Sequence, residues 1–412
     1  MPTLDVLALV LAGGQGSRLE VLTQDRAKPA LPFAGCYRLI DFSLSNLRHS
    51  GIDDVWVLVQ FEVQSILDVL AGGRPWDLDR SHGGLRIVPP QQESDDEENE
   101  GWHEGNAHAL YANRELIAKA APDLLLVLSA DHVYRLDYRD VIAQHRATGA
   151  EATVVSTVVP VAQATHHAVL EVGDGGTITD VIVKPDQAPH GVVATEVFLY
   201  DTAVLLETLE KLAGDGDGSE LADFGDRLLP ALIERGAVHE FRLPGYWKDL
   251  GRPESFFAAH TDLLTAHRSG GAADLELDDQ DSPILSHDVP RMPAFIEDSA
   301  EVVDSLVSPA CRVAGRVERS VLGPGTVVEA GASVIDSVLF HDVVVRSGAT
   351  VQHALVDDHT VIGADATVGA RAPGALPSDD DLAMLGAHSR VDGGATVAPG
   401  DRIDRNGRRR RR

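Results

Sequence analysis

The chain has few of the residues that build disulfide frameworks or thiolate metal sites. Its 412 residues include two cysteines, Cys36 and Cys311, without the paired spacing of a disulfide scaffold or a zinc ribbon. Long apolar runs are also missing: no stretch approaches the roughly 20 apolar residues that span a bilayer. The N-terminus lacks the basic start and cleavage site of a signal peptide. We therefore expect a cytoplasmic protein with two reduced, buried cysteines.

Positive charge is scarce as well. Lysine and arginine number 35 against 64 acidic residues, which gives a net charge of −29. A balance this acidic opposes general binding to nucleic acid or to an anionic membrane. If the substrates are phosphates, they must be neutralised locally by a few placed Lys and Arg side chains and a divalent cation.

The N-terminal part of the chain alternates short apolar runs with amphipathic segments, as α/β domains do. The runs expected to be buried strands are Val6 to Leu11, Val55 to Val59, Leu124 to Leu128 and Ala152 to Val159. The acidic stretch 94–100 predicts a solvated loop, and Arg252 to Ser269 predicts an amphipathic helix. We expect a domain over residues 1–269, followed by an acidic, glycine-containing linker over 270–285.

Beyond the linker the apolar residues recur every six positions, which neither a helix nor an ordinary strand explains. This hexapeptide spacing is typical of a β-helix, in which each short strand forms one face of a triangular coil. It predicts a left-handed β-helix over 286–404, interrupted by a protruding loop over 371–390. The basic tail 405–412 is expected to be disordered, with docking on the acidic body as the alternative. The periodic positions are Ile296, Val302; Val307, Val313; Leu322, Val328, Val334; Leu339, Val345, Val351; Val356, Ile362, Val368; Val391, Val397, Ile403.

A glycine-rich turn follows the first predicted strand and offers bare backbone amides that can hold phosphate oxygens. It is neither a dinucleotide fingerprint nor a P-loop, because the third glycine and the Gly-Lys-Ser/Thr of those motifs are missing. A tight strand-to-helix turn is the alternative interpretation. Arg18, Arg26 and Lys28 follow closely and concentrate positive charge beside it, which favours a triphosphate site. The candidate nucleotide-binding residues here are Leu11, Ala12, Gly13, Gly14, Gly16, Ser17 and Arg18.

Residues 12–52, AGGQGSRLEVLTQDRAKPALPFAGCYRLIDFSLSNLRHSGI, resemble the opening of the bacterial ADP-glucose pyrophosphorylases, the glucose-1-phosphate adenylyltransferases of glycogen synthesis. That family has GGRGTRL, RAKPA, RIIDF and LSN in the same order. The resemblance continues through Pro90-Gln91-Gln92, Trp102, Ser129 to Tyr134, Lys184-Pro185, Phe224-Gly225 and Tyr246 to Gly251. It implies a Rossmann-like, mixed-sheet nucleotidyltransferase domain of the GT-A-like type before the β-helix, and a homotetramer under allosteric control.

Asp131 stands just past a predicted buried strand, at the sheet edge where open α/β sheets bind ligands; a helix cap or surface residue is the alternative. The resemblance implies that Asp131 and Asp249 bind Mg²⁺, which prefers one or two carboxylates plus phosphate oxygens. It implies that Lys184 holds the sugar phosphate and that Gln91 and Gly105 recognise the base, and it makes Arg18, Lys28, Asp131 and Lys184 the catalytic residues. The implied reaction is attack of a sugar 1-phosphate on the α-phosphorus of ATP, with catalysis by positioning and charge neutralisation.

The sequence departs from the family pattern mainly on the sugar side. Gln15 replaces an arginine, His108 an acid, Val183 a glutamate, and Glu196 the glycine of a strand that lines the sugar pocket. We assign Glu196 and Asp249 with Lys184 to the sugar-phosphate site. Three hypotheses remain: a true ADP-glucose enzyme, a related pyrophosphorylase for another sugar or base, or a weakly active regulatory paralogue. A scaffold protein and a β-helix acyltransferase using His341, His353 or His359 are further alternatives.

Overall fold

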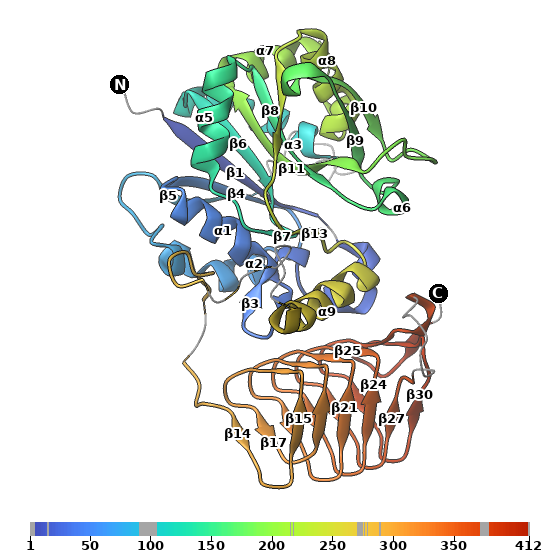
Figure 1. Cartoon of the computed structure of the whole chain (residues 1–412). Helices are drawn as coiled ribbons and strands as arrows, with labels where there is room; N and C mark the ends of the chain where they lie inside the picture. The colour runs from blue at the N-terminus through green and yellow to red at the C-terminus, as the bar shows by residue number, and fades with distance from the viewer. Residues whose placement is uncertain are drawn as a thin grey trace.

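The computed structural model describes residues 5–14, 16–89, 105–214, 216, 218–269, 275, 277, 279–287, 290–370 and 379–410. Two layered bodies lie one above the other in Figure 1, a sheet flanked by helices and a coil of short strands, with helix α9 between them. This agrees with the two predicted fold types. The predicted loop 94–100 and residues Gln15, Gln91 and Trp102 lie outside the described residues.

The N-terminal body is built on a mixed sheet with strand order β10-β9-β11-β6-β1-β4-β5, and β8 joins β11 to β12. Strand β1 runs parallel to β4 on one side and to β6 on the other. From β1 the chain first crosses to β4 and β5 on one side, and it later returns to β6 on the other side. Such a change of side opens a crevice at the carboxyl ends of β1 and β6. The four predicted strands are confirmed as β1, β4, β6 and β8. The bounds are β1 Val6–Ala12, β4 Asp54–Val59, β5 Gly84–Val88, β6 Leu124–Ser129, β8 Ala152–Val158, β9 Ala168–Val172, β10 Ile178–Val183, β11 Val192–Asp201 and β12 Val238–Arg242.

Helices cover both faces of this sheet, because its central strands are apolar on both sides. One face packs against α3, α4, α7 and α8, and the other against α1, α2 and α5. Asp201 caps α7 by accepting a hydrogen bond from the Val204 amide (3.2 Å), which fixes where that helix starts. The helices are α1 Leu39–His49, α2 Val63–Leu70, α3 Asn106–Ala112, α4 Arg114–Ala120, α5 Tyr138–Thr148, α6 Val161–Ala164, α7 Thr202–Ala213, α8 Leu229–Glu234 and α9 Pro253–Ser269. The shorter helical turns are η1 Ser17–Thr23, η2 Lys28–Ala30, η3 Ala71–Trp76, η4 Asp174–Gly176, η5 Ser219–Leu221, η6 Phe224–Leu228 and η7 Asp379–Asp381.

The C-terminal body is the predicted β-helix, with three stacks of short parallel strands around an aliphatic interior. The six-residue spacing brings equivalent side chains of successive coils into register, as where Val313, Val328 and Val345 stack. The strands are β14 Phe295–Ile296, β15 Glu301–Val303, β16 Leu306–Val307, β17 Arg312–Val313, β18 Arg316–Glu318, β19 Val321–Leu322, β20 Val327–Val328, β21 Ser333–Ile335, β22 Val338–Leu339, β23 Val344–Val345, β24 Thr350–Gln352, β25 Ala354–Val356, β26 Val361–Ile362, β27 Thr367–Val368, β28 Ala383–Leu385, β29 Arg390–Val391, β30 Thr396–Val397, β31 Arg402–Ile403 and β32 Arg409–Arg410.

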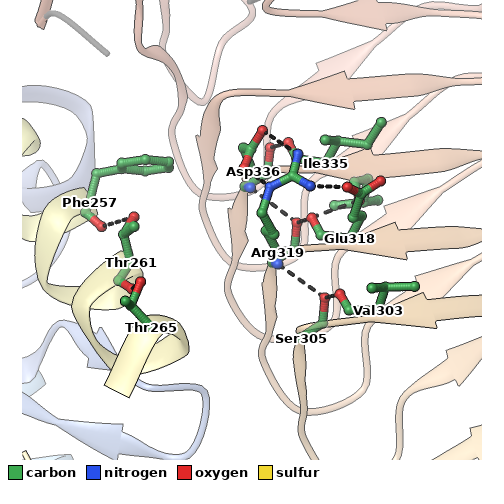
Figure 2. Close-up of polar contacts among 12 residues, drawn as sticks. Phe257, Thr261, Thr265, Val303, Ser305, Glu318, Arg319, Ile335 and Asp336 are labelled. Carbon is green, nitrogen blue, oxygen red and sulfur yellow. Dashed lines mark hydrogen bonds and ion pairs between the residues drawn. The ribbon is translucent and has the colours of Figure 1, made fainter. Parts of the chain in front are cut away.

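The corners of the coils carry polar contacts, and one set faces the side of α9 (Figure 2). Arg319 makes two parallel hydrogen bonds to Asp336 of the next coil, at 2.7 and 2.9 Å, and also pairs with Glu318. Within α9, the Thr261 hydroxyl donates to the Phe257 carbonyl. Bidentate arginine–carboxylate pairs are geometrically specific. The pair of Arg319 with Asp336 therefore fixes the register between two coils.

Two parts of the β-helix differ from the sequence-based expectation. Within the predicted loop 371–390, residues Ala383–Leu385 form strand β28 next to β25, since Ala383 and Leu385 fill the β-helix interior and Met384 packs in the interface with the first body. In the predicted disordered tail, Arg409–Arg410 pair antiparallel with β31, and Arg405 contacts Asp25 at 2.6 Å. Strand pairing with β31 and the ion pair of Arg409 with Asp401 hold this part of the tail on the β-helix, and Arg405 adds one exposed contact with the acidic body, as in the docking alternative. The boundaries of the domains and the linker stay predictions.

An apolar interface joins the two bodies. Phe33, Phe42 and Phe256 of the first body pack with β-helix residues such as Phe340 and Met384 in one buried cluster. The rings of Phe256 and Phe340 lie 5.9 Å apart, edge to face. In the predicted linker, Leu285 exchanges hydrogen bonds with the Ser45 hydroxyl of α1. Among the described residues, no helix has the length and apolar character needed to cross a bilayer.

Candidate active site

A small two-stranded ladder brings the two predicted metal-binding aspartates together. Strands β7 (His132–Tyr134) and β13 (Trp247–Asp249) pair antiparallel, with Asp249 directly opposite His132. Asp131 precedes β7 and follows β6, at the crevice beside β1. The two carboxylates therefore meet at the carboxyl edge of the main sheet although the chain separates them widely. The structure also has a second short ladder, β2 (Pro32–Phe33) with β3 (Tyr37–Arg38), which carries the chain away from η2.

Lys28 joins the two aspartates. Its ammonium group contacts Asp131 Oδ2 and lies 3.4 Å from Asp249 Oδ1, while the residue as a whole is 6% exposed. Burial favours neutral forms, but here the opposite charges outweigh it: the pKa of Lys28 is raised by Asp131 and Asp249, and the pKa of each aspartate is lowered by Lys28 and His132. All three groups are therefore charged at neutral pH.

His132 adds a nitrogen ligand to this cluster. Its Nδ1 donates to the Thr195 carbonyl at 3.0 Å, so its Nε2 is directed to the aspartates, 3.5 Å from Asp131 Oδ1 and 3.6 Å from Asp249 Oδ1. Burial lowers the pKa of His132, but Asp131, Glu196 and Asp249 outweigh it and raise the pKa. Asp131, His132 and Glu196 each offer a ligand atom, and these atoms lie within 4.8 Å of one another. The cluster can hold a metal ion.

Glu196 reaches the cluster from an irregular point of β11. The pairing of β11 with β8 shifts register between Ala194 and Phe198, and Glu196 takes φ +58° inside that irregularity. This left-handed conformation suits glycine and costs other residues roughly 1 kcal/mol or more. Burial raises the pKa of Glu196 to about 7, with the nearby Asp131 and Asp249 adding to the rise against the favourable charges of His132 and Lys28.

A cavity of about 650 Å³ opens on one side of the carboxylates. The glycine turn, Asp131, Glu196 and the start of α3 line it. Gly13 and Gly105 leave no room for a side chain: a Cβ would lie 2.8 Å from Gln60 Oε1 at Gly13 and 2.4 Å from the Ala222 carbonyl at Gly105. At Gly105 the contact is with backbone, which would have to shift, so this position requires glycine; at Gly13 the Gln60 side chain would have to move.

A second cavity of about 690 Å³ lies on the other side of the carboxylates, between α9, the β-helix and the β7–β13 ladder. Arg18, Lys184 and Arg252 line it together with Asp249 and Trp247. Lys184 has φ +45° and donates its amide to the His167 carbonyl at 3.0 Å. The carboxylate cluster thus lies between a first cavity bordered by bare glycine backbone and a second cavity lined by cationic side chains.

The predicted site residues divide between these regions. Leu11, Gly13, Gly14, Lys28, Gly105, Asp131 and Glu196 line the first cavity, and Arg18, Lys184 and Asp249 line the second. Ala12 is buried in the sheet, while Gly16 and Ser17 lie in the turn beside the cavities. Glu196 and Lys184, assigned together to the sugar phosphate, thus approach from opposite sides. Gln91 lies outside the described residues.

Three further residues contribute to the site without having been singled out. His132 follows Asp131 directly in the chain, and the Ser129 hydroxyl contacts Asp131 Oδ1. Asp223 lines the first cavity and accepts a hydrogen bond from the Asn106 amide at 3.3 Å. The adjacency of His132 to Asp131 was a signal for the first; Asp223 has no local pattern that separates it from other surface acids.

Comparison with known proteins agrees with this arrangement. Residues 7–266 match the model of the nucleotidyl transferase family, and residues 294–374 match the GlmU-like C-terminal hexapeptide model. The chain is 35% identical over 363 residues to a glucose-1-phosphate adenylyltransferase of Bacillus thuringiensis (strain Al Hakam), covering 88% of this chain and 94% of that protein. The protein of the same name from Bacillus cytotoxicus is 34% identical over 357 residues, 86% of this chain and 92% of its own length. The chain belongs to the nucleotidyl transferase family and, within it, to the glucose-1-phosphate adenylyltransferases.

Proposed function

We propose that this chain transfers an adenylyl group from ATP to α-D-glucose 1-phosphate, giving ADP-glucose and pyrophosphate for α-glucan synthesis. The observation that carries the proposal is the meeting of Lys28, Asp131 and Asp249 between two cavities. The first cavity, with its bare glycine backbone, suits the nucleotide. The second, with Arg18 and Lys184, presents cations to the opposite side of the same carboxylates.

The donor set fits Mg²⁺. Asp131 and Asp249 supply ionised carboxylate oxygens, and Glu196 a third carboxyl nearby; Mg²⁺ prefers a few such ligands and completes its shell with phosphate oxygens and water. We propose that Asp131 and Asp249 hold the ion. When bound, Mg²⁺ would neutralise charge on the reacting phosphates.

Positioning and charge account for the rest of the chemistry. An oxygen of the sugar phosphate forms a bond to the α-phosphorus, and the bond from that phosphorus to the pyrophosphate oxygen breaks, so no protein nucleophile is needed. Lys28 is fixed between the two aspartates and can stabilise negative charge there. Arg18 and Lys184 have exposed side chains that can close on phosphates, and Gly105 and Gln91 are proposed to contact the base.

Glu196 favours a second candidate function. Its carboxyl group occupies part of the first cavity near Asp131, where the family pattern has a glycine. If the sugar reaches this part of the first cavity, a charged group there excludes glucose unless it pairs with a hydroxyl. A pyrophosphorylase for another sugar 1-phosphate or another nucleotide is therefore the alternative. The presence of Lys28, Asp131 and Asp249 in one cluster speaks against a weakly active regulatory paralogue.

We propose a cytoplasmic homotetramer. The first coil of the β-helix supports association, because β14 and β15 stand at the open edges of their sheets: β14 exposes Phe295 and Ile296 (61% and 46%), and β15 exposes Val303 (42%). Exposed apolar edges of this kind are usually covered in an assembly. Light scattering after size-exclusion chromatography would give a mass four times that of the chain; a monomer would refute this part.

The function is tested by incubating the purified chain and Mg²⁺ with each nucleoside triphosphate and a panel of sugar 1-phosphates, while pyrophosphate release is measured. We expect ATP with glucose 1-phosphate to give the highest kcat/KM. Release only with another sugar or nucleotide would establish the alternative. Release with none of the pairs would refute both enzymatic hypotheses.

A further inference from the structure

The segment that follows the glycine turn packs against the β-helix as well as against the body to which it belongs by sequence. Leu19, Val21 and Leu22 of η1 are buried in the interface cluster together with β-helix residues Leu355, Leu382 and Met384. Gly386 lets the two backbones approach closely, since a Cβ there would lie 3.3 Å from the Val21 carbonyl. The last coils of the β-helix thus form one wall behind the proposed triphosphate site.

One ion pair in this wall involves a residue with an unusual backbone. Glu20 has φ +52° and ψ −113° within η1, a conformation that residues other than glycine rarely adopt. Its carboxylate accepts a hydrogen bond from Arg402 Nε at 2.7 Å. Arg402 is 3% exposed and lies on β31, and its Nη1 donates to the Leu382 and Gly400 carbonyls at 2.6 and 2.9 Å. The guanidinium group is therefore held by the β-helix and presented to Glu20.

Short contacts connect Glu20 to the turn. The Gly16 carbonyl accepts hydrogen bonds from the Leu19 amide and the Thr23 hydroxyl, both at 2.9 Å. These bonds close η1 into a compact loop on either side of Glu20. A displacement of Glu20 would therefore move Gly16, and with it the amides that border the first cavity.

A second connection ends at Lys28. Arg26 pairs with Asp357 at 2.5 Å and with Asp358 at 3.1 Å, both on the β-helix, and Asp357 is 1% exposed. Lys28 comes two residues later in the chain and contacts Asp131. The segment between the glycine turn and Lys28 is thus tied to the β-helix at two points, by Arg402 at Glu20 and by Asp357 at Arg26.

We propose that Arg402 is a positioning residue for nucleotide binding: by holding Glu20 in its left-handed conformation, it sets the glycine turn in the orientation that receives the triphosphate. The β-helix then takes part in the nucleotide site of its own chain. This inference rests on the proposed function, because it assumes that the first cavity binds ATP.

The test compares Arg402→Ala and Arg402→Lys with Arg405→Ala in the full-length chain. Arg405 is the matched control, because it pairs with Asp25 of the same segment but both side chains are largely exposed (56% and 44%), and exposed pairs contribute little. We expect Arg402→Ala to raise the KM for ATP about tenfold, while the KM for glucose 1-phosphate changes less than about twofold. Arg402→Lys should recover part of the loss, and Arg405→Ala should behave as the wild type.

A second measurement does not depend on turnover. Arg18 is exposed at the start of η1, so trypsin cleavage after Arg18 reports how firmly the segment is held. We expect faster cleavage there in Arg402→Ala and in Glu20→Gln than in the wild type or Arg405→Ala. An unchanged KM for ATP with unchanged cleavage would overturn the inference, as would an equal rise in both KM values with a lower Tm. A wild type that makes no pyrophosphate would refute the proposed function, and the cleavage rates would still decide the role of Arg402.

Discussion

Replacing Glu196 should stabilise the protein, and by more at high pH than at low pH. The folded-state pKa of Glu196 is about 7, against 4.5 for the ordinary glutamate. An acid with a raised pKa destabilises the folded state when ionised, so the cost is absent well below pH 4.5, grows between pH 4.5 and 7, and is complete above pH 7. This shift corresponds to a destabilisation of roughly 3 kcal/mol at pH 8.5 and roughly 1 kcal/mol at pH 5.5.

Two substitutions separate the charge from the backbone conformation. Glu196→Gln removes the charge and keeps the left-handed residue, so its stabilisation should grow by about 2 kcal/mol between pH 5.5 and pH 8.5. Glu196→Gly should add about 1 kcal/mol at every pH, because glycine takes φ +58° without strain. Unfolding free energies from urea titrations in metal-free buffer at the two pH values measure both effects. Equal stabilisation at both pH values, or destabilisation by Glu196→Gln, would refute the reasoning.

The same variants report on the sugar. If Glu196 binds hydroxyl groups of the natural substrate, Glu196→Gly should lower kcat/KM for that sugar phosphate roughly 10- to 100-fold. A rise with glucose 1-phosphate would show that the carboxyl group blocks glucose and that another sugar is the natural one. An unchanged value would mean that the side chain takes no part in binding the sugar.

Three more predictions follow from the site and the interface. Asp131→Asn and Asp249→Asn should each lower turnover at least about 100-fold; near-normal initial rates in protein that is still folded would refute the metal assignment. Gly105→Ala should raise the KM for ATP, because its Cβ would lie 2.4 Å from Ala222; unchanged kinetics would place Gly105 away from the nucleotide. Removing residues 286–412 should give an aggregated product, because the buried cluster around Phe33 and Phe256 would lose its cover; a fully active soluble fragment would contradict this.

Periodic patterns made most of the fold predictable. The six-residue repeat indicated the β-helix, and runs such as Leu124 to Leu128 indicated the central strands, because burial selects the same residue types in every such element. The strand at Ala383–Leu385 escaped prediction, since it follows a break in the repeat and is recognisable only from the coil beside it. The ordered part of the tail pairs with β31 and places Arg405 beside Asp25, 380 positions away, and neither contact follows from a local pattern.

The site was predictable where a motif carries the chemistry, and less so where tertiary contacts do. Asp131, Asp249 and Lys28 stood in recognisable motifs, and the structure brings them together. The ion pair of Glu20 with Arg402 spans 382 positions and belongs to no local pattern. For the left-handed conformation of Glu196 the signal was indirect: the family pattern has a glycine there, and the register shift in β11 accounts for it.

The central claim is adenylyl transfer at the cluster of Lys28, Asp131 and Asp249, and the reverse reaction tests it most directly. The chain would be incubated with Mg²⁺, radiolabelled pyrophosphate and either ADP-glucose or other nucleotide sugars, and label in the nucleoside triphosphate would be counted. We predict labelled ATP from ADP-glucose with the wild type, and at least about 100-fold less with Asp131→Asn. No label from ADP-glucose, or equal label with wild type and Asp131→Asn, would contradict the claim.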